Sequence, residues 1–322
     1  MKSKEEIKKI ALNTIENEIE EILKLKTSIN DNFVACVELI LNSTGRVIIT
    51  GIGKSANIAA KIVATLNSTG TPSVFMHAAD AIHGDLGIIQ KDDIVICLSK
   101  SGNTPEIKVL VPIIKMMKNT LIGMVGDKES FLAKNADLIL HTSVSKEACP
   151  NNLAPTSSTT AQLVMGDALA VSLLECRGFT TEDFARFHPG GILGKNLYLK
   201  VEDLMKHNQL PIVNESDNIN NVIIEMTSKR LGATAVVNKN NKLVGIITDG
   251  DLRRMLQKNN DISKLRADDI LTKNPRSINK ESLAANALII MKNMNITQLI
   301  VTENESVVGF IHLHDILKEG II

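Results

Sequence analysis

"VIITGIGKSANIAA", residues 47–60, joins an apolar run to a helical pattern through a glycine turn. A glycine turn between a strand and a helix often binds phosphate, because the free N–H groups at the helix N-terminus attract an anion. The triphosphate-binding loop GxxxxGK[ST] would require a glycine where this chain has Ile48. The turn is therefore too short for that class of loop.

Two further phosphate-binding interpretations of the turn remain. Gly51, Gly53 and Ala56 match the dinucleotide-binding spacing GxGxxA, but the second apolar run ends on His77 and not on an acidic residue that would hold a ribose. A turn for a smaller phosphate would bring Lys54 to a phosphate monoester or a sugar oxygen. The alternative to both is a plain strand–helix connection with a solvated lysine.

The overall composition excludes several classes of function. The length of 322 residues suggests about two domains, and 44% hydrophobic residues suffice for sizeable cores. Aromatic residues make up 2% of the chain, too few for the stacking platforms that bind single-stranded nucleic acid. The 36 basic residues equal the 36 acidic ones, so neither a nucleic-acid partner nor a membrane partner is expected.

The cysteines and the N-terminal segment predict a soluble, cytoplasmic protein. The cysteines are far apart and form no CxxC pair, which suits reduced thiols: Cys36, Cys97, Cys149 and Cys176. The N-terminal segment is too charged for a signal peptide, and no window is apolar enough to cross a membrane.

Short apolar runs alternate with helical segments in the first part of the chain. Residues 4–42 show helical spacing, and another long helix is predicted over 155–177. The apolar runs between them are "VIIT", "SVFM", "DIVICLS", "TLIGMVG" and "DLILHTS". Continuous β-branched runs separated by helices indicate a parallel sheet covered on both faces. The prediction is an α/β domain with a doubly wound, five-stranded parallel sheet over 43–200, preceded by a helical segment at 1–42.

The remainder of the chain contains a tandem repeat. "LVGIITDGDLRRML" recurs as "VVGFIHLHDILKEG", so that Gly245 corresponds to Gly309 and Asp251 to Asp315. Each copy is too small to bury much surface alone, so the two are expected to pack together as one α+β unit.

Two loops at the expected ligand-binding edge are rich in polar side chains. Ligands of an open parallel sheet bind beyond the carboxyl ends of its strands. The polar residues there are Ser99, Ser101, Asn103 and Thr104 in "SKSGNT", and Ser157, Ser158, Thr159 and Thr160 in "PTSSTT". Hydroxyls beside a helix N-terminus suit a phosphate. Helix capping is the alternative, but one cap needs one hydroxyl, so phosphate binding is favoured.

Two acidic residues and a histidine fall in the same predicted layer of loops. Glu106 and Glu147 follow apolar runs, and His188 precedes a Pro-Gly-Gly turn. A carboxylate and an imidazole beside a sugar phosphate suit enediol chemistry, in which a base moves a proton between neighbouring carbons. Taken singly, each of the three is more often a solvated or capping group.

His77 and His83, with Asp80 and Asp85 nearby, give a weak metal signal. Their spacing is poor for ligands on one helix face. Polar residues at the rim of the site are the favoured interpretation.

The chain resembles the D-arabinose 5-phosphate isomerases. The resemblance rests on "GIGKSANIAAKIVATLNSTGTPSVFMHAADAIHGDLG", "SKSGNTPEI", "KEACPNNLAPTSSTTAQLVMGDALAV" and "GFTTEDFARFHPGGILGKNL", and it covers nearly the whole chain. These are sugar isomerase (SIS) domain proteins with a C-terminal pair of CBS modules, which places the modules here at 201–260 and 266–322. The resemblance implies interconversion of D-ribulose 5-phosphate and D-arabinose 5-phosphate, supply of the acid Kdo for lipopolysaccharide, and a homotetramer.

The resemblance also implies which residues carry the reaction. The catalytic positions are Lys54, Glu106, Glu147 and His188. Lys54 would steady phosphate or a developing oxyanion, and Glu147 would be the enediol base with Glu106 as its rival. His188 would open the sugar ring or act as an acid, in its own or a neighbouring subunit.

Further contacts follow from the same resemblance. Substrate contacts are implied at Gly70, Thr71, His83, Ser143 and Ser145. No cofactor is required, although a zinc ion is associated with the position of His77. Lys100 departs from the Asn or Arg of many relatives and adds charge beside the phosphate loop.

CBS pairs often bind adenine nucleotides through a hydroxyl and an aspartate, and an adenine or cytidine nucleotide is the implied ligand here. Thr248 and Asp251 keep that pair in the first module. The second module has His312 in place of the hydroxyl and keeps Asp315, so at most one good site is expected. A purely structural pair is the alternative.

Two competing functions stay open from the sequence. One is a non-catalytic SIS–CBS sensor of sugar phosphates, which the absence of a basic DNA-binding domain disfavours. The other is an SIS isomerase acting on a different ketose phosphate, although such enzymes usually lack the CBS pair.

Overall fold

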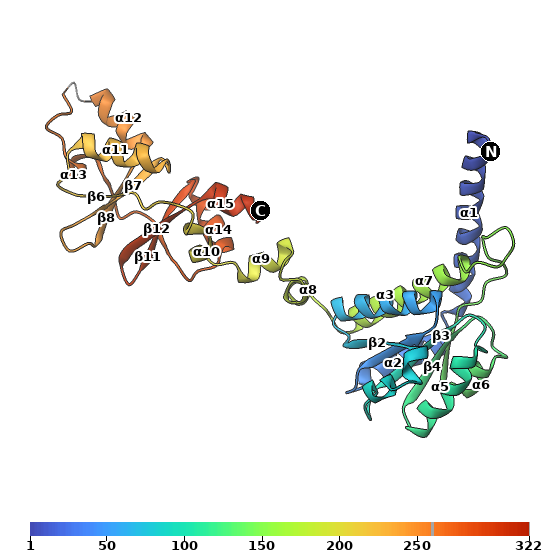
Figure 1. Ribbon diagram of the computed structural model, residues 1–322. Coiled ribbons are helices and arrows are strands. Elements are labelled where there is room, and N and C mark those ends of the chain that lie inside the picture. The colour runs from blue at the N-terminus through green and yellow to red at the C-terminus, as the bar shows by residue number, and fades with distance from the viewer. Residues whose placement is uncertain (259–260, 322) are drawn as a thin grey trace. The chain divides into compact units, whose positions relative to one another are not determined.

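The computed structural model describes residues 1–258 and 261–321. The ends predicted for the two CBS modules, residues 260 and 322, lie outside that range. The chain forms two compact units, Met1–Phe184 and Ala185–Ile322, joined within α8 (Thr181–Phe187) (Figure 1).

A five-stranded parallel sheet forms the centre of the first unit, as predicted. Its strands are β1 (Val47–Gly51), β2 (Ser73–His77), β3 (Ile94–Ser99), β4 (Thr120–Val125) and β5 (Leu138–His141). They lie in the order β2-β1-β3-β4-β5, and every neighbouring pair is parallel. The chain order reverses beside β1, so the ends of β1 and β3 form the switch point where ligands of such sheets bind.

Helices cover both faces of this sheet because alternate strand residues point to opposite sides. Ile49 and Ile96 pack with α2, α3 and α7, whereas Ile48 and Val95 pack with α4, α5 and α6. The helices and turns are α1 (Lys4–Lys24), η1 (Leu25–Ser28), α2 (Asp31–Asn42), α3 (Lys54–Ser68), α4 (Ala78–Ala81), η2 (Asp85–Ile88), α5 (Pro105–Met116), α6 (Phe131–Asn135) and α7 (Ser157–Cys176). Figure 1 shows α3 and α7 together on one side of the strands.

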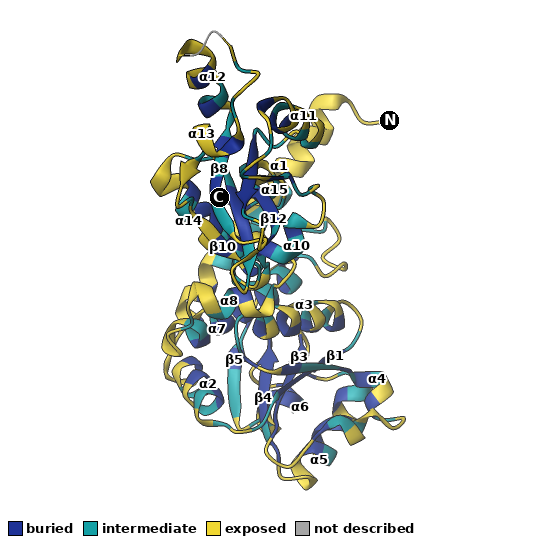
Figure 2. Ribbon diagram, turned by 90° about the vertical axis from the view of Figure 1, so that its left-hand side faces the viewer, coloured by how far each residue is buried: buried dark blue, intermediate teal, exposed yellow. Residues whose placement is uncertain are grey.

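The single helix predicted over 4–42 is broken. The chain leaves α1 through η1 and begins α2 afresh, because the Asn30 side chain accepts a hydrogen bond from the Asn32 N–H at 3.0 Å and caps the new helix. The residues in the first half of α1 are exposed, as their yellow colour in Figure 2 shows. Its second half turns Glu21 into the unit, where the side chain is buried.

The second unit repeats one order of elements twice. That order is strand, helix, two strands and helix, in which the first pair of strands is parallel and the second antiparallel. The elements are α9 (Ile192–Tyr198), α10 (Val201–Met205), β6 (Ile212–Asn214), α11 (Ile219–Lys229), β7 (Ala233–Val237), β8 (Leu243–Thr248), α12 (Asp249–Lys258), α13 (Ala267–Ile270), β9 (Thr272–Lys273), β10 (Ser277–Asn279), α14 (Ala284–Met294), β11 (Gln298–Glu303), β12 (Ser306–His312) and α15 (Leu313–Lys318).

The two repeats pack equivalently and share a core. A Cβ added at Gly245 would lie 2.7 Å from Leu271, and one at Gly309 would lie 2.7 Å from Met205. Side chains from both copies, including Ala235 and Phe310, meet in one buried cluster. The copies therefore fold as a pair. No helix of the described chain is long and apolar enough to cross a membrane.

Candidate active site

Three of the predicted loops line one cavity at the carboxyl ends of β1 and β3. The cavity has a volume of about 220 Å³. Its walls are Ile52, Lys54 and Ser55 at the start of α3, Leu98, Ser99, Lys100, Ser101 and Thr104 between β3 and α5, and Pro155, Ser158 and Thr159 at the start of α7. The starts of two long helices and two lysines thus border a space of the size of a small phosphate ester, a favourable setting for an anion.

The glycine turn that opens α3 depends on the lack of a side chain. Gly53 has a φ of +59°, and a Cβ at Gly51 would approach the Ser55 backbone to 3.1 Å. No side chain caps the helix, so its first N–H groups are left for another acceptor. Lys54 is the exposed first residue of α3 and lines the cavity.

The polar residues of the β3–α5 loop divide between turn-forming and cavity-lining roles. Ser99 Oγ accepts from the Gly102 N–H at 3.0 Å, and Asn103 Oδ1 accepts from the Phe131 N–H at 3.0 Å. These two side chains hold the loop, as the capping alternative expects. Ser101 is exposed at the cavity, whereas Thr104 Oγ1 is buried and lacks a hydrogen-bond partner in the described chain.

The hydroxyls at the start of α7 divide in a similar way. Thr159 and Thr160 donate to the carbonyl of Thr156 at 2.8 and 3.1 Å, so their hydroxyls are used within the helix. Ser157 and Ser158 are buried. Ser158 both lines the cavity and donates its backbone N–H to Glu147.

Glu147 lies immediately behind the cavity wall with a fully buried side chain. Its Oε2 accepts from the N–H groups of Thr156 and Ser158 at 2.8 and 3.1 Å. Its Oε1 accepts from Lys100 Nζ at 2.5 Å. One oxygen is thus anchored to the backbone of the α7 start, and the other is covered by a lysine from a different loop.

The environment of Glu147 strongly favours its charged form. Burial by itself would raise the pKa of this carboxyl. The Lys100 ammonium and the backbone N–H groups of Thr156 and Ser158 outweigh burial and lower the pKa of Glu147 to about 2. Glu147 is therefore ionised at neutral pH, but it is a weak base while Lys100 stays bound.

The contact of Lys100 with Glu147 was not predicted from the sequence. The sequence suggested only that Lys100 adds charge beside the phosphate loop, whereas the structure pairs it with Glu147. The sequence places the cation Lys100 in one predicted ligand loop and the carboxylate Glu147 in another. Sequence alone cannot show that the two side chains meet.

Glu106 has a different environment. It lies in the first turn of α5, half-buried, after Pro105 and the Thr104 cap. Within the described residues, its carboxylate has no hydrogen-bond or ion-pair partner. A carboxylate at a helix N-terminus interacts favourably with the helix dipole, and the Glu106 carboxylate keeps this position without a direct contact.

Ser143 and Ser145 do not line the cavity. Ser143 is exposed, whereas Ser145 donates Oγ to Glu21 Oε1 at 2.5 Å and accepts from Lys24 Nζ at 2.6 Å. The Ser145 N–H also donates to Glu21 Oε2 at 2.8 Å. The Ser145 hydroxyl therefore links α1 to the loop that carries Glu147, through hydrogen bonds.

Gly70 and Thr71 lie at the opposite edge of the sheet from Lys54, just before β2 begins. A Cβ at Gly70 would meet the Phe179 ring at 2.7 Å, and the Thr71 N–H donates to the Leu66 carbonyl at 2.8 Å. The structure does not bring these two residues to the cavity of their own unit.

The predicted histidines are dispersed. His83 is exposed after α4, and His77 Nδ1 lies 3.5 Å from Asp80 Oδ2. His188 belongs to the second unit, where its carbonyl accepts from the Gly191 N–H at 3.0 Å. It is not part of the unit that holds Glu147.

The donors around His77 do not fit a zinc site. Zinc in proteins usually takes three or four side-chain ligands. Across the described ranges, no group of three or more His, Cys, Asp or Glu gathers in a way that could hold a metal.

The two aspartates predicted in the CBS pair have unlike surroundings. Asp251 Oδ2 accepts from Thr248 Oγ1 at 2.6 Å, and its Oδ1 accepts from Arg254 at 2.6 Å. This cluster borders a pocket of about 310 Å³ that also reaches Arg276. Asp315 Oδ2 instead accepts from the side-chain amide of Asn208 at 2.6 Å.

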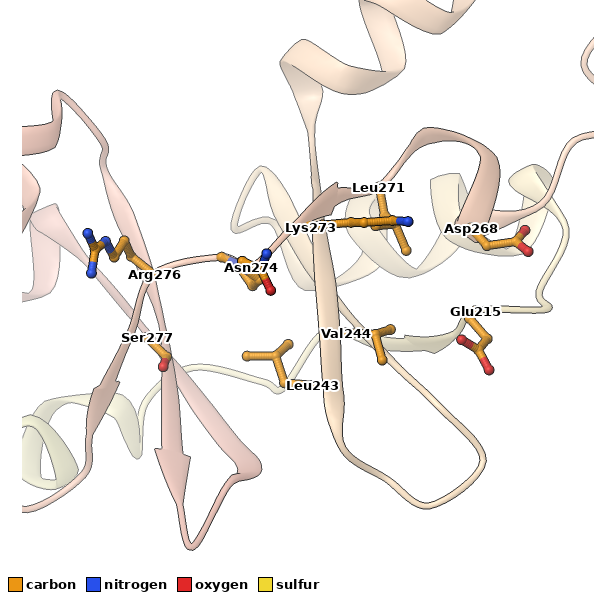
Figure 3. Close-up of a pocket in the computed structure, with 10 residues that line it drawn as sticks. Glu215, Leu243, Val244, Asp268, Leu271, Lys273, Asn274, Arg276 and Ser277 are labelled. Atoms are coloured by element: carbon orange, nitrogen blue, oxygen red, sulfur yellow. The ribbon is translucent and has the colours of Figure 1, made fainter.

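A larger pocket, of about 1050 Å³, lies beside the segment that connects the two modules. Figure 3 shows Asn274 and Arg276 on this connecting segment and Leu243 and Val244 on β8. Glu215 and Asp268 lie at its far side. Cationic and acidic side chains are spread around it without converging on one point.

Comparisons with known proteins agree with the order of the units. The SIS domain model matches residues 40–172, and the CBS domain model matches 201–258 and 267–321. Arabinose 5-phosphate isomerase KdsD of Pseudomonas aeruginosa is 49% identical over 97% of this chain and 96% of its own length. The enzyme of the same name from Escherichia coli K12 is 44% identical over 95% of this chain and 93% of its own.

Solved structures are also similar to part of this chain, and one of them holds a sugar phosphate. It is the c3406 protein of Escherichia coli CFT073, in complex with arabinose 5-phosphate, which is 39% identical, with a TM-score of 0.57. The match covers 58% of this chain and 100% of that one.

Proposed function

This chain belongs to the arabinose 5-phosphate isomerase family, and we infer that it interconverts D-arabinose 5-phosphate and D-ribulose 5-phosphate. The identity to curated isomerases extends over both units. The similar c3406 structure holds arabinose 5-phosphate. The observation in the molecule that carries the inference is a buried carboxylate, Glu147, directly behind a cavity bordered by helix N-termini and two lysines.

We propose the following division of roles. The phosphate of the substrate binds in the cavity between the starts of α3 and α7. Glu147 removes the proton from C2 of the aldose, and the electrons form the enediolate. The hydroxyl proton of O2 passes to O1, and return of the carbon-bound proton to C1 gives the ketose. Lys54 stabilises the phosphate or the oxyanion that develops on the sugar. Glu106 is the rival base.

His188 has the remaining proposed role, which is to open the sugar ring or move hydroxyl protons. Because it belongs to the second unit, it would act at its own site or at the site of a neighbouring copy in the homotetramer that we propose. From the family resemblance we also propose that five further residues contact the substrate: Gly70, Thr71, His83, Ser143 and Ser145. We also propose that the reaction needs no metal, so that chelation of the purified protein leaves turnover unchanged.

The experiment that tests the function is an isomerisation assay. The purified chain is given D-arabinose 5-phosphate, and formation of the ketopentose phosphate is followed, with ribose 5-phosphate and glucose 6-phosphate as parallel substrates. Turnover of the arabinose compound alone supports the proposed reaction and its stereochemistry. Binding of sugar phosphate by the folded chain without any turnover would contradict it and favour a sensor.

We propose that the enzyme works in the cytoplasm and that its product supplies Kdo for lipopolysaccharide. Four free cysteines among the described residues are consistent with a reducing compartment. We also propose that one adenine or cytidine nucleotide binds the CBS pair at Thr248 and Asp251. The support is the pocket beside these two residues.

A further inference from the structure

Glu147 cannot reach a substrate in the arrangement described above. Its side chain has no exposed surface, and the Lys100 ammonium covers Oε1, the oxygen that faces away from the α7 backbone. A general base must come within hydrogen-bond reach of the proton that it removes. Either Glu147 is only structural, or Lys100 has to leave during the reaction.

Lys100 is free to move in a way that Glu147 is not. Its side chain is 47% exposed and lines the cavity, whereas its carbonyl is fixed by the Gly126 N–H at 3.1 Å. The lysine side chain can therefore turn without moving the loop. Glu147 Oε2 keeps its two backbone hydrogen bonds, so the carboxylate stays oriented when its other oxygen is released.

A sugar phosphate supplies the reason for the lysine to turn. A phosphate monoester carries about −1.5 to −2 charges at neutral pH, compared with −1 on the carboxylate. At equal distance and in the same surroundings, it attracts an ammonium group up to about twice as strongly. The cavity in which the phosphate would bind is lined by Lys100 itself.

We propose that Lys100 is a positioning residue of the isomerisation, whose ammonium moves from Glu147 to the substrate phosphate and thereby uncovers Oε1 as the proton acceptor. This role rests on the proposed function and specifies how its base is activated. The proton that leaves C2 goes to Oε1 and returns to C1, so Lys100 gains and loses no proton. Without substrate, the same lysine keeps the base covered and weak.

Other charged or titratable groups lie on the elements around Glu147. Lys100 approaches Glu147 from the β3–α5 loop, and Lys54 of α3 lines the same cavity as Lys100. Cys149 and Lys146 share the loop of Glu147, and Lys146 lies 3.9 Å from Glu20 of α1. Only Lys100 makes an ion pair with Glu147 within the described parts of the chain.

The test compares Lys100→Met and Lys100→Arg with the wild-type enzyme. Methionine keeps the length of the side chain without its charge, and arginine keeps the charge. For Lys100→Met we expect KM for D-arabinose 5-phosphate to rise about tenfold or more through loss of a charged phosphate contact. Lys100→Arg should bring KM back to within about threefold of wild type. Lys108→Met, on the exposed face of α5, is the matched control and should leave KM unchanged.

The pH profiles separate a positioning role from a structural one. The profile of kcat/KM reports the free enzyme, and that of kcat reports the substrate complex. Lys100→Met should move the acid limb of kcat/KM upward by about one pH unit or more, because Glu147 loses its cation. The acid limbs of the kcat profiles should coincide in wild type and Lys100→Met. In the wild-type substrate complex Lys100 has already left Glu147, so Glu147 lacks the cation in both enzymes. The substrate phosphate titrates equally in both enzymes.

Two results would overturn this role. If the kcat limbs separate as widely as the kcat/KM limbs, Lys100 stays on Glu147 during the reaction. If neither KM nor the pH profiles change in a folded Lys100→Met enzyme, Lys100 has no part in it. Absence of turnover by the wild-type chain would instead overturn the proposed function itself, so the two failures are distinguishable.

Discussion

At the level of single residues, the two candidate bases differ in what surrounds their carboxylates. Glu147 has four interactions and no exposed surface, whereas Glu106 is half-buried and uncommitted. We expect Glu147→Gln to lower kcat by about 100-fold or more, because it removes the proton acceptor, and to change KM little. Steady-state kinetics on the purified variant measure both constants.

Glu106→Gln is the matched variant for this prediction, since it neutralises the other carboxylate in the same layer of loops. Its kcat should fall much less than that of Glu147→Gln. Near-normal turnover of Glu147→Gln would transfer the role of base to Glu106.

Glu147 also links folding stability to pH. Its pKa is lowered from 4.5 to about 2, so its ionised form stabilises the folded state, fully above about pH 5. This contribution is lost as the pH falls from 4.5 towards 2. Between pH 7 and pH 3 we expect wild type to lose on the order of 2 kcal/mol more stability than Glu147→Gln. Urea unfolding at the two pH values tests this, and equal losses would show that Glu147 is not held in this way.

At the scale of secondary-structure elements, α1 holds the loop that carries Glu147 in place through hydrogen bonds. The buried carboxylate of Glu21 accepts from the N–H and Oγ of Ser145, and Glu18 accepts from Thr160 at 3.2 Å. We expect Glu21→Gln to reduce the free energy of unfolding by about 1.5–3 kcal/mol, because hydrogen bonds to a buried charge are lost. Turnover should fall with it, because the loop is less well held.

The control for this element is Glu20→Gln. Glu20 is exposed, and its only neighbouring cation in the described chain, Lys146, lies 3.9 Å away, so its loss should cost less than about 1 kcal/mol. Chemical denaturation and the isomerase assay measure both variants. Equal behaviour of the two variants would mean that α1 does not support the site.

The elements of the first unit were predictable to different degrees, for physical reasons. The five strands could be predicted because buried parallel strands are continuous apolar runs, and the ligand loops follow from where those strands end. The break at Asn30 could not, because a cap of one residue hardly changes the helical spacing on either side of it. The pairing of Lys100 with Glu147 could not either, because it depends on how two loops far apart in the sequence come together.

Gly70 and Thr71 illustrate the limit of the family resemblance. The resemblance implied substrate contacts there, but in their own unit they precede β2, whereas the cavity lies beyond the strand ends. The resemblance identifies residues by their position in the sequence and does not say whether they line this cavity.

At the scale of the whole molecule, the two CBS copies differ at the aspartate that we propose for nucleotide binding. Asp251 interacts with Thr248 and Arg254, whereas Asp315 interacts with Asn208. We expect an adenine or cytidine nucleotide to raise the melting temperature of wild type, and Asp251→Ala to abolish that rise. Asp315→Ala, its counterpart in the second module, should leave the rise intact. Thermal shift with AMP, ATP and CMP-Kdo measures the effect. No shift with any of them would favour a purely structural pair.

A nucleotide at the second of these positions would compete with the Asn208 amide, which already donates a hydrogen bond to Asp315. A group on the same chain is present at an effective concentration on the order of millimolar or above, whatever the concentration of free ligand. A nucleotide that approaches Asp315 would therefore have to displace the Asn208 amide, which stays close to Asp315 because it belongs to the same chain. Occupancy of the pair should saturate at one nucleotide per chain, with the second position closed by the protein itself.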